Sequence, residues 1–330
     1  MSIFGDFGYL DSVQRPVKLK RRDATPFHGL EPEWSAQYSR DMLETMKDDL
    51  DMMWIVGDIG YVDDSFASNP LKFTYETVYN NWMNWMQNIT SKMPLMVSPG
   101  NHESECHSPV CVVQELKYGR HLANFTAFSH RFSMPSEESG GRGNMWYSWN
   151  YNSAHFVSIN TETDWEGAEE QKMGDSHIPW MKAGGFGEDG EFLKWLEADL
   201  KAASEAKERG EISWIIAGGH RPYSTIQAMA GVEGWFKDYG VDMYFAGHSH
   251  SYSRTVDDTS PMYVVAGGAG CDEMGPSKES LLLGPLGTDM VESDRYSTGV
   301  LTVSEESLKW ELVDSIDGSI LDQAEINKAR

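Results

Sequence analysis

Met-Met-Trp-Ile-Val-Gly-Asp-Ile-Gly-Tyr, residues 52–61, joins an apolar run to a turn that carries Asp58 and Tyr61. The continuous apolar residues at the start of this stretch predict a buried strand. Gly57 permits a tight turn directly after the strand, so the turn can direct the carboxylate and the phenol inward. The stretch therefore predicts a strand that ends at two possible metal-binding side chains.

Similar turns follow other apolar runs, and each carries polar side chains. They are Phe4-Gly5-Asp6, Gly100-Asn101-His102, Gly219-His220-Arg221-Pro222, Gly247-His248 and Ser249-His250. Because the carboxyl ends of strands in open α/β sheets converge on one crevice, these turns are expected to meet. The residues expected to bind metal are Asp6, Asp58, Tyr61, Asn101, His220, His248 and His250.

The chemistry of this set predicts two adjacent metal ions. Carboxylate, amide oxygen, phenolate and imidazole are ligands that hard or borderline cations prefer. Asp58 has two oxygens and can bridge two ions, while His248 and His250 straddle the ions if the turn between them bends. Two ions about 3.5–4 Å apart suit phosphate-ester cleavage, because they clamp both the attacking and the leaving oxygens.

Strands and helices alternate along the first part of the chain, and strand pairs dominate its end. Strands are expected over residues 2–5, 52–56, 94–98, 146–151, 154–160, 212–217, 243–245, 262–266, 299–303 and 308–313, and helices over residues 32–50, 71–93, 191–209 and 229–239. Residues 103–143 are expected to be loop-rich, and residues 163–190 to form a surface loop at the rim. This order predicts one domain of the α/β (α+β) class, with a sheet-on-sheet core and helices outside it.

The chain is strongly acidic, with 27 Lys and Arg residues against 51 Asp and Glu residues and a formal net charge of −24. This charge repels nucleic-acid phosphates, which argues against nucleic acid as a partner. Asp6, Asp58 and an ionised Tyr61 contribute −3, and a trivalent plus a divalent ion contribute +5, so a loaded site of about +2 still attracts a phosphate ester. No run of 18 apolar residues is present, so no membrane span is expected.

Cysteines and glycosylation triplets bear on the compartment. Cys106 and Cys111 could close a small disulfide loop in an oxidising compartment, whereas as a zinc pair they lack further ligands nearby. Cys271 is interpreted as a buried free thiol. Asn88-Ile89-Thr90 and Asn124-Phe125-Thr126 are acceptor triplets for N-glycosylation. These features predict a secreted or lumenal glycoprotein, although no signal-peptide pattern is present in this chain.

The ordered set resembles the metallophosphoesterase superfamily, and within it the purple acid phosphatases, over residues 4 to about 303. Gly8 stands where most superfamily members place a histidine two residues after the first aspartate, and Tyr61 stands three residues after the second aspartate, as in purple acid phosphatases. Further similar segments are Met145-Trp146-Tyr147-Ser148, His155-Phe156-Val157-Ser158, Thr161-Glu162-Thr163-Asp164 and Tyr263-Val264-Val265-Ala266-Gly267-Gly268-Ala269-Gly270. They look most like the fungal and protist forms.

The resemblance implies a four-layer αββα sandwich of two mixed β-sheets flanked by helices. It implies a single catalytic domain over residues 1–330, without the N-terminal β-sandwich of larger members. Fe(III) would be held by Asp6, Asp58, Tyr61 and His250, and a divalent Fe, Zn or Mn ion by Asp58, Asn101, His220 and His248. A metal-bound hydroxide would attack phosphorus in line, and charge transfer from Tyr61 to Fe(III) would give a purple colour. His102 would donate a proton to the leaving group or orient the ligands, and Arg221 would contact phosphate or brace its loop.

The function implied by the resemblance is that of an acid phosphatase, a metal-dependent hydrolase of small-molecule phosphate monoesters. A phosphodiesterase or nucleotide pyrophosphatase on the same scaffold is the first alternative, because pocket shape separates these activities. A secreted protein that binds metal or phosphate without catalysis is the second. Plant-type members carry additional histidines after the metal-binding histidine, and residues 224–234 contain none. Protonation of the leaving group therefore rests on His102 or on another group.

Overall fold

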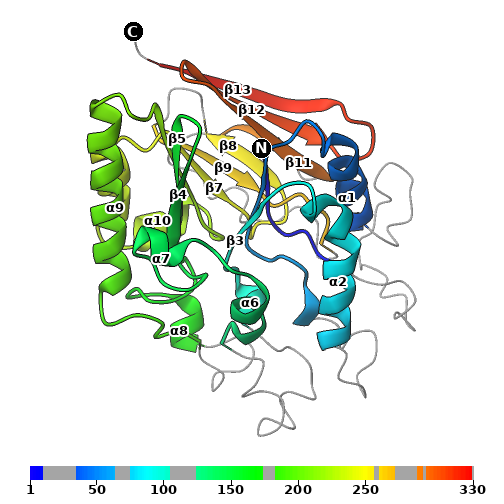
Figure 1. Ribbon diagram of the computed structural model, residues 1–330, viewed down its shortest axis with the longest axis horizontal. Helices are drawn as coiled ribbons and strands as arrows, with labels where there is room; N and C mark the ends of the chain where they lie inside the picture. Colours follow the sequence, from blue (N-terminus) through cyan, green and yellow to red (C-terminus); the bar gives the residue numbers. More distant parts are fainter. Residues whose placement is uncertain are drawn as a thin grey trace, which may run out of the picture.

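The structure is a computed structural model that describes residues 1–9, 35–63, 75–104, 124–173, 183–255, 260–271, 288–292 and 295–328. Within these ranges the strands form two mixed sheets packed face to face, and helices lie on the outer face of each sheet (Figure 1). This is the four-layer αββα sandwich expected from the sequence. Cys106 and Cys111 lie outside the described residues.

The first sheet contains six strands within the described ranges, in the order β13-β12-β11-β1-β2-β3. Their bounds are β1 Ser2–Phe4, β2 Met53–Val56, β3 Leu95–Ser98, β11 Ser297–Val303, β12 Ser307–Asp314 and β13 Ile320–Asn327. β1, β2 and β3 run parallel to one another. The turns that carry Asp6, Asp58 and Asn101 therefore begin at the same edge of the sheet.

The second sheet contains seven strands within those ranges, in the order β10-β8-β9-β7-β6-β5-β4. Their bounds are β4 Tyr147–Tyr151, β5 Ala154–Ser158, β6 Trp214–Gly218, β7 Met243–Ala246, β8 Tyr252–Thr255, β9 Met262–Ala266 and β10 Thr288–Glu292. β5, β6, β7 and β9 run parallel. The turns that carry His220 and His248 thus begin at the carboxyl ends of two neighbouring strands.

Helices cover the outer face of each sheet (Figure 1). α1 Ser35–Met46 and α2 Tyr75–Thr90 lie over the first sheet, and α9 Glu191–Glu208, α10 Tyr223–Ala228 and α11 Val232–Asp238 lie over the second. The short helices are α3 Asn101–Ser104, α6 Thr126–Arg131, α7 Ser136–Ser139 and α8 Glu169–Met173. In α2 the buried residues, among them Val78, Trp82 and Met86, recur at helical spacing and face the core, as an amphipathic helix requires.

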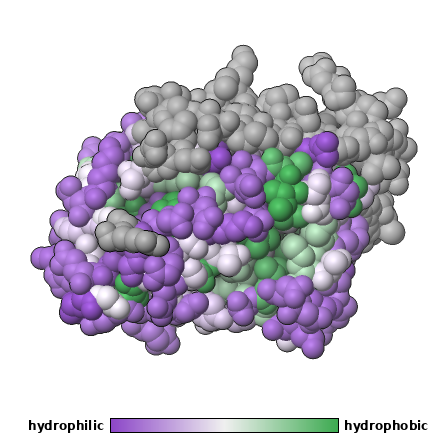
Figure 2. Space-filling view, turned by 90° about the horizontal axis from the view of Figure 1, so that it is seen from above, coloured by the Kyte–Doolittle hydropathy of each residue, from purple (hydrophilic) through white to green (hydrophobic). Residues whose placement is uncertain are grey.

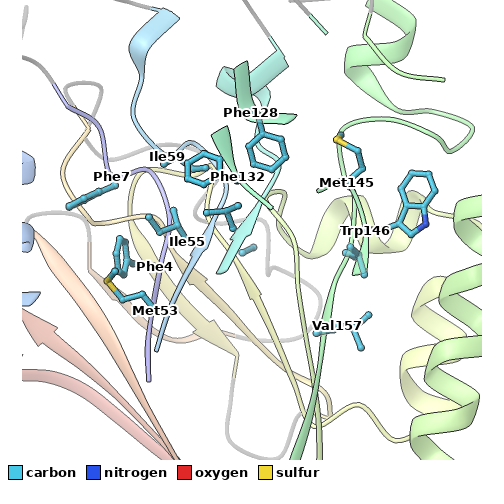
Figure 3. Close-up of a cluster of buried hydrophobic side chains, with 14 of the residues drawn as sticks. Phe4, Phe7, Met53, Ile55, Ile59, Phe128, Phe132, Met145, Trp146 and Val157 are labelled. Atoms are coloured by element: carbon cyan, nitrogen blue, oxygen red, sulfur yellow. The ribbon is translucent and has the colours of Figure 1, made fainter. Parts of the chain in front are cut away.

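Alternation of side chains along the strands builds two core layers. In β2, Trp54 and Val56 point between the sheets and join apolar side chains of both. Met53 and Ile55 point the other way, into the layer beneath the helices, part of which Figure 3 shows. All four side chains are fully buried, and burial of one such side chain stabilises the fold by about 1.5–3 kcal/mol.

Buried polar side chains also join the two sheets. Ser98 Oγ at the end of β3 lies 2.8 Å from Ser158 Oγ at the end of β5, and it accepts a hydrogen bond from Trp54 Nε1 at 2.9 Å. Elsewhere, Arg254 Nε of β8 donates to Asp322 Oδ2 of β13 at 2.7 Å. The serine pair lies just before the turn that carries Asn101, so it fixes the two sheets to each other where the polar turns meet.

Strands β8, β10 and β13 and helix α10 were not expected from the sequence. β8 reads Tyr-Ser-Arg-Thr, and its polar residues are buried because the strand lies inside the second sheet, between β10 and β9, and because Arg254 pairs with Asp322. β13 is an edge strand with several polar residues. A hydrophobic pattern does not reveal strands of either kind. The described part of residues 103–143 also contains α6 and α7, so it is less loop-rich than expected.

Among the coloured residues of the face seen in Figure 2, hydrophilic ones cover most of the area, and hydrophobic ones form patches between them. Among the described helices, none combines the length and the apolar character needed to cross a membrane.

Candidate metal centre

The turns after β1, β2 and β7 place their polar residues in a strained backbone conformation. Asp6, Asp58, Tyr61, His248 and His250 have φ between 44° and 68°. Residues other than glycine adopt this left-handed region at a cost, and such residues cluster at functional sites. Here the strain falls on residues that the sequence predicted to bind metal.

The first half-site consists of Asp6, Asp58, Tyr61 and His250. Tyr61 Oη lies 3.1 Å from Asp6 Oδ1, 3.2 Å from Asp58 Oδ2 and 2.8 Å from His250 Nε2. Both carboxylates are fully buried. The single phenol proton can serve only one of the two carboxylates at a time.

The second half-site consists of Asp58, Asn101, His220 and His248. Asn101 Oδ1 lies 3.1 Å from His220 Nε2 and 3.1 Å from His248 Nδ1. His220 Nε2 lies 3.1 Å from Asp58 Oδ2, the oxygen that also contacts Tyr61. The carboxylate of Asp58 therefore joins the two half-sites. His248 and His250 lie one in each, so the turn between them bends as the straddling arrangement requires.

The donor atoms fit bound cations. A hydrogen bond of 3.0 Å from His220 Nδ1 to the carbonyl oxygen of Val56 leaves Nε2 of the neutral ring as an acceptor. That nitrogen faces oxygens of Asn101 and Asp58 that are also acceptors, an arrangement that a cation between them stabilises. Carboxylate, phenol, amide and imidazole groups suit Fe(III) and divalent Fe, Zn or Mn. The residues present therefore fit the two metal ions expected from the sequence.

The electrostatics of the centre favour a positive charge on His220 and a neutral ring at His248. Burial lowers the pKa of His220, but the Asp58 carboxylate outweighs burial and raises this pKa to about 9. Burial raises the pKa of Asp58, but the positive charges of His220 and His102 outweigh it and hold this pKa well below its ordinary value. Burial and the positive charge of Arg221 lower the pKa of His248. A metal ion at His220 must therefore displace a proton, so its binding is linked to pH.

Glycines beside the ligands provide space as well as turns. A Cβ atom at Gly100 would lie 2.3 Å from Asp58 Oδ1, and one at Gly57 would lie 2.4 Å from His220 Nδ1. Gly57 also has a φ of +86°. An alanine at either position would therefore displace a residue of the second half-site.

Replacing Gly57 with alanine is expected to lower the free energy of unfolding by about 2–5 kcal/mol, because it adds a clash with His220 to the strain of a left-handed alanine. Gly140→Ala is the matched control, since Gly140 has a φ of +68° and no heavy atom within 4 Å of a built Cβ. Urea unfolding of both variants measures the difference. Equal losses would contradict the role assigned to the space beside His220.

His102 lies beside the half-sites. Its backbone N–H donates to Asp58 Oδ1 at 3.0 Å, and its ring centroid lies 4.1 Å from that of Tyr61. Its Nδ1 lies 2.7 Å from Oδ2 of Asp63, a fully buried carboxylate. A buried carboxylate in this position fixes the tautomer and the orientation of the ring. Asp63 was missed in the sequence, where it stands in an unremarkable pair of aspartates.

Glu103 was also missed, although it holds two of the turns together. Its Oε2 accepts hydrogen bonds of 2.9 Å from the backbone N–H groups of Asp58 and Gly100, and its Oε1 accepts one of 2.8 Å from Ile59. Burial and the charge of Asp58 raise the pKa of Glu103 to about 8, although these N–H groups favour its charged form. The carboxylate therefore fastens the turn after β2 to the turn after β3. A glutamate next to His102 was the only signal in the sequence.

Arg221 is enclosed by carboxylates. Its Nε lies 2.8 Å from Glu162 Oε2, its Nη1 lies 2.8 Å from Glu169 Oε2, and its Nη2 lies 3.4 Å from Glu170 Oε1. Its Nη1 also lies 3.3 Å from His248 Nε2. Of the two expected roles, contact with phosphate or support of a loop, these contacts favour support.

Residues 163–190 supply Glu169 and Glu170 and were expected to form a surface loop, and their described part agrees with this only partly. In its described part Thr163, Ala168 and Glu170 are buried. Residues 169–173 form α8. The acidic and glycine-rich composition is typical of a surface loop, but here Glu170 is buried because it pairs with Arg221.

Cys271 adjoins the first half-site. It is buried and is a free cysteine, as expected from the sequence. Its backbone N–H donates to the carbonyl oxygen of Asp6 at 3.0 Å. Burial lowers the pKa of His250, but the charge interaction with Cys271 and hydrogen bonds with Asp6 and Cys271 outweigh it and hold this pKa well above its ordinary value. The thiol therefore takes part in the electrostatics of the half-site.

Two mixed sheets between helices, with carboxylate, phenol, amide and imidazole donors gathered at the strand ends, define a metallophosphoesterase. The family profile for calcineurin-like phosphoesterases matches residues 4–252, and the profile for iron/zinc purple acid phosphatase-like protein C matches residues 260–323. The chain belongs to the calcineurin-like phosphoesterases and, within them, to the purple acid phosphatase family.

Sequence relatives agree with this assignment. The chain is 30% identical to an acid phosphatase of Aspergillus ficuum over 77% of this chain and 52% of the relative. It is 30% identical to acid phosphatase A of Cryphonectria parasitica over 84% and 63%, and 28% identical to purple acid phosphatase 15 of Arabidopsis thaliana over 67% and 40%, respectively. The chain thus spans about half the length of the curated relatives it matches.

Solved structures show the same fold. The purple acid phosphatase PPD1 of yellow lupin superposes over 99% of this chain and 53% of its own chain, with a TM-score of 0.61 and 18% identity. GAP50, described as the anchor in the inner membrane complex of Plasmodium, superposes over 100% of this chain and 88% of its own, with a TM-score of 0.53 and 14% identity. At these identities the similarity concerns the fold alone.

Proposed function

We propose that the chain is the catalytic domain of a metal-dependent acid phosphatase that hydrolyses small-molecule phosphate monoesters. The observation that carries this proposal is the shared carboxylate of Asp58, which contacts Tyr61 in one half-site and His220 in the other. A bridging carboxylate between two donor sets suits a pair of metal ions. We treat residues 1–330 as a single catalytic domain.

The two half-sites would hold the two ions. We assign Asp6, Asp58, Tyr61 and His250 to Fe(III), and Asp58, Asn101, His220 and His248 to a divalent Fe, Zn or Mn ion. When bound, the ions would supply an activated water and neutralise charge on the phosphoryl oxygens. The protein fixes the donors through buried contacts, so little reorganisation is needed when charge develops.

His102 is the residue we propose as proton donor to the leaving group. Its contact with the buried carboxylate of Asp63 orients the imidazole, and its backbone donates to Asp58 at the centre of the site. General acid catalysis by a histidine contributes about 10²–10⁴-fold to a rate. In this scheme Asp63 is a positioning residue, and Arg221 braces His248.

Two other functions are alternatives, and rates on two phosphate esters distinguish them from the proposed function. A phosphodiesterase or nucleotide pyrophosphatase would use the same donors, and relative rates on a phenyl phosphate monoester and the matching diester separate it from a monoesterase. A binding protein without catalysis would bind metal or phosphate but turn over neither ester. The fold similarity to GAP50, whose description names an anchor, makes this measurement worthwhile.

Metal analysis combined with a visible absorption spectrum tests the proposed centre. We expect one iron and one further metal ion per chain, together with an absorption band that arises from Tyr61 and Fe(III). Tyr61→Phe should lose most of this band, because the phenolate is its source. A wild-type protein without iron, or a Tyr61→Phe variant with an unchanged band, would contradict the assignment.

We also infer a secreted or lumenal location for a glycoprotein. The two acceptor residues, Asn88 and Asn124, are both exposed on the surface. An exposed asparagine side chain leaves room for an attached glycan. The expected partners are small phosphate esters, and the net charge of −24 argues against nucleic acid.

A further inference from the structure

The guanidinium of Arg221 is held by two buried carboxylates. Glu162 and Glu170 are 0% and 4% exposed, and they lie 2.8 Å and 3.4 Å from its nitrogens. The third carboxylate, that of Glu169, lies 2.8 Å away but its side chain is 69% exposed. Buried charges of this kind require partners, so removal of one leaves the others uncompensated.

The same two carboxylates are linked to the second half-site by hydroxyl groups. Thr161 Oγ1 donates to Glu162 Oε1 at 2.7 Å and accepts from the backbone N–H groups of His220 at 3.2 Å and Arg221 at 3.1 Å. This contact joins the carboxylate to the turn after β6.

A second hydroxyl links Glu170 to the turn after β3. Ser104 Oγ lies 3.0 Å from Glu170 Oε2 and 2.7 Å from the carbonyl oxygen of Asn101. The guanidinium of Arg221 contacts the turn after β7, because its Nη1 lies 3.3 Å from His248 Nε2. The turns of Asn101, His220 and His248 are therefore all fastened to residues 161–170.

We propose that Glu162 and Glu170 are positioning residues for the metal ion of the second half-site, acting through Arg221, Thr161 and Ser104. They fix the positions of three of its four donors, which are Asn101, His220 and His248. They also compensate the positive charge of Arg221, which would otherwise repel a cation beside His248. Residues behind metal ligands affect metal affinity by about 10–100-fold. This inference rests on the metal-dependent function proposed above.

Calorimetric titration of the metal-depleted chain with Zn²⁺ or Mn²⁺ tests the proposal. The test variant is Glu162→Gln, which keeps the size of the side chain and removes its charge. It should weaken one of the two binding steps by about 10–100-fold and leave the other nearly unchanged. Glu169→Gln is the matched control, and because its ion pair is exposed, it should change either step by no more than about fivefold.

The outcomes distinguish this inference from the proposed function. If the wild-type chain binds no metal, the proposed function fails and this inference falls with it. If the wild-type chain binds two ions and Glu162→Gln binds both as tightly, only the inference fails. Equal weakening of both steps would indicate a general structural effect and would overturn it as well. Should Glu162→Gln not fold, as judged by circular dichroism, Glu170→Gln is titrated in its place with the same expectations.

Discussion

Replacing Asp58 with asparagine is expected to reduce phosphate-monoester hydrolysis by about 10³-fold or more, because both half-sites depend on its carboxylate. Asp58 Oδ2 contacts Tyr61 and His220, and Oδ1 accepts from the backbone of His102. Asparagine has almost the same shape, but it lacks the negative charge and the second strong acceptor needed to bridge two ions.

Steady-state rates and metal content of purified Asp58→Asn measure this effect. Both should fall, because loss of the bridge weakens both half-sites. Asp199→Asn is a suitable control, since Asp199 is a carboxylate that contacts His155 and Ser148 instead of the metal centre. Full activity with a normal metal content in Asp58→Asn would refute the proposed centre.

His102→Ala is expected to have the next largest effect, a loss of about 10²–10⁴-fold in turnover. The loss should depend on the leaving group, because only a poor leaving group needs a proton. It should be large for an alkyl phosphate and small for a nitrophenyl phosphate. Metal content should change little, since His102 belongs to neither half-site in our assignment.

The Asp63→Asn variant distinguishes the orientation of the His102 ring from its role as a proton donor. An asparagine can still contact Nδ1 but does not stabilise the protonated ring, so an intermediate loss with the same dependence on leaving group is expected. Rates on the two esters for both variants provide the comparison. If both esters slow equally in His102→Ala, the residue has a structural role and another group protonates the leaving group.

Most of the fold could be predicted from local patterns. The runs that became β2, β3, β6 and β7 are short, apolar and followed by glycine, and α2 and α9 show helical periodicity, so each element is visible within its own residues. β8 and β13 could not be predicted in this way. Arg254 in β8 is buried because Asp322 in β13 pairs with it, and these residues are 68 positions apart.

The residues of the centre were predictable for the same reason. A polar side chain placed just after a strand is brought to the strand end by local geometry, and parallel neighbours bring these ends together. All seven expected ligands lie in the two half-sites, while Asp63, Glu103 and Glu162 were not expected in any role. They reach the centre across separations of 39, 45 and 59 residues.

The sequence by itself determined which donors the candidate centre contains and which class of chemistry they suit, because residue type and position after a strand are local properties. Only the tertiary structure decided which donor faces which, how His102 and Arg221 are held, and that residues 161–170 are fastened to the second half-site. These depend on distances and directions between atoms that are remote in the chain. No periodicity or turn signal in the sequence predicts these contacts, because they form only when the two sheets pack together.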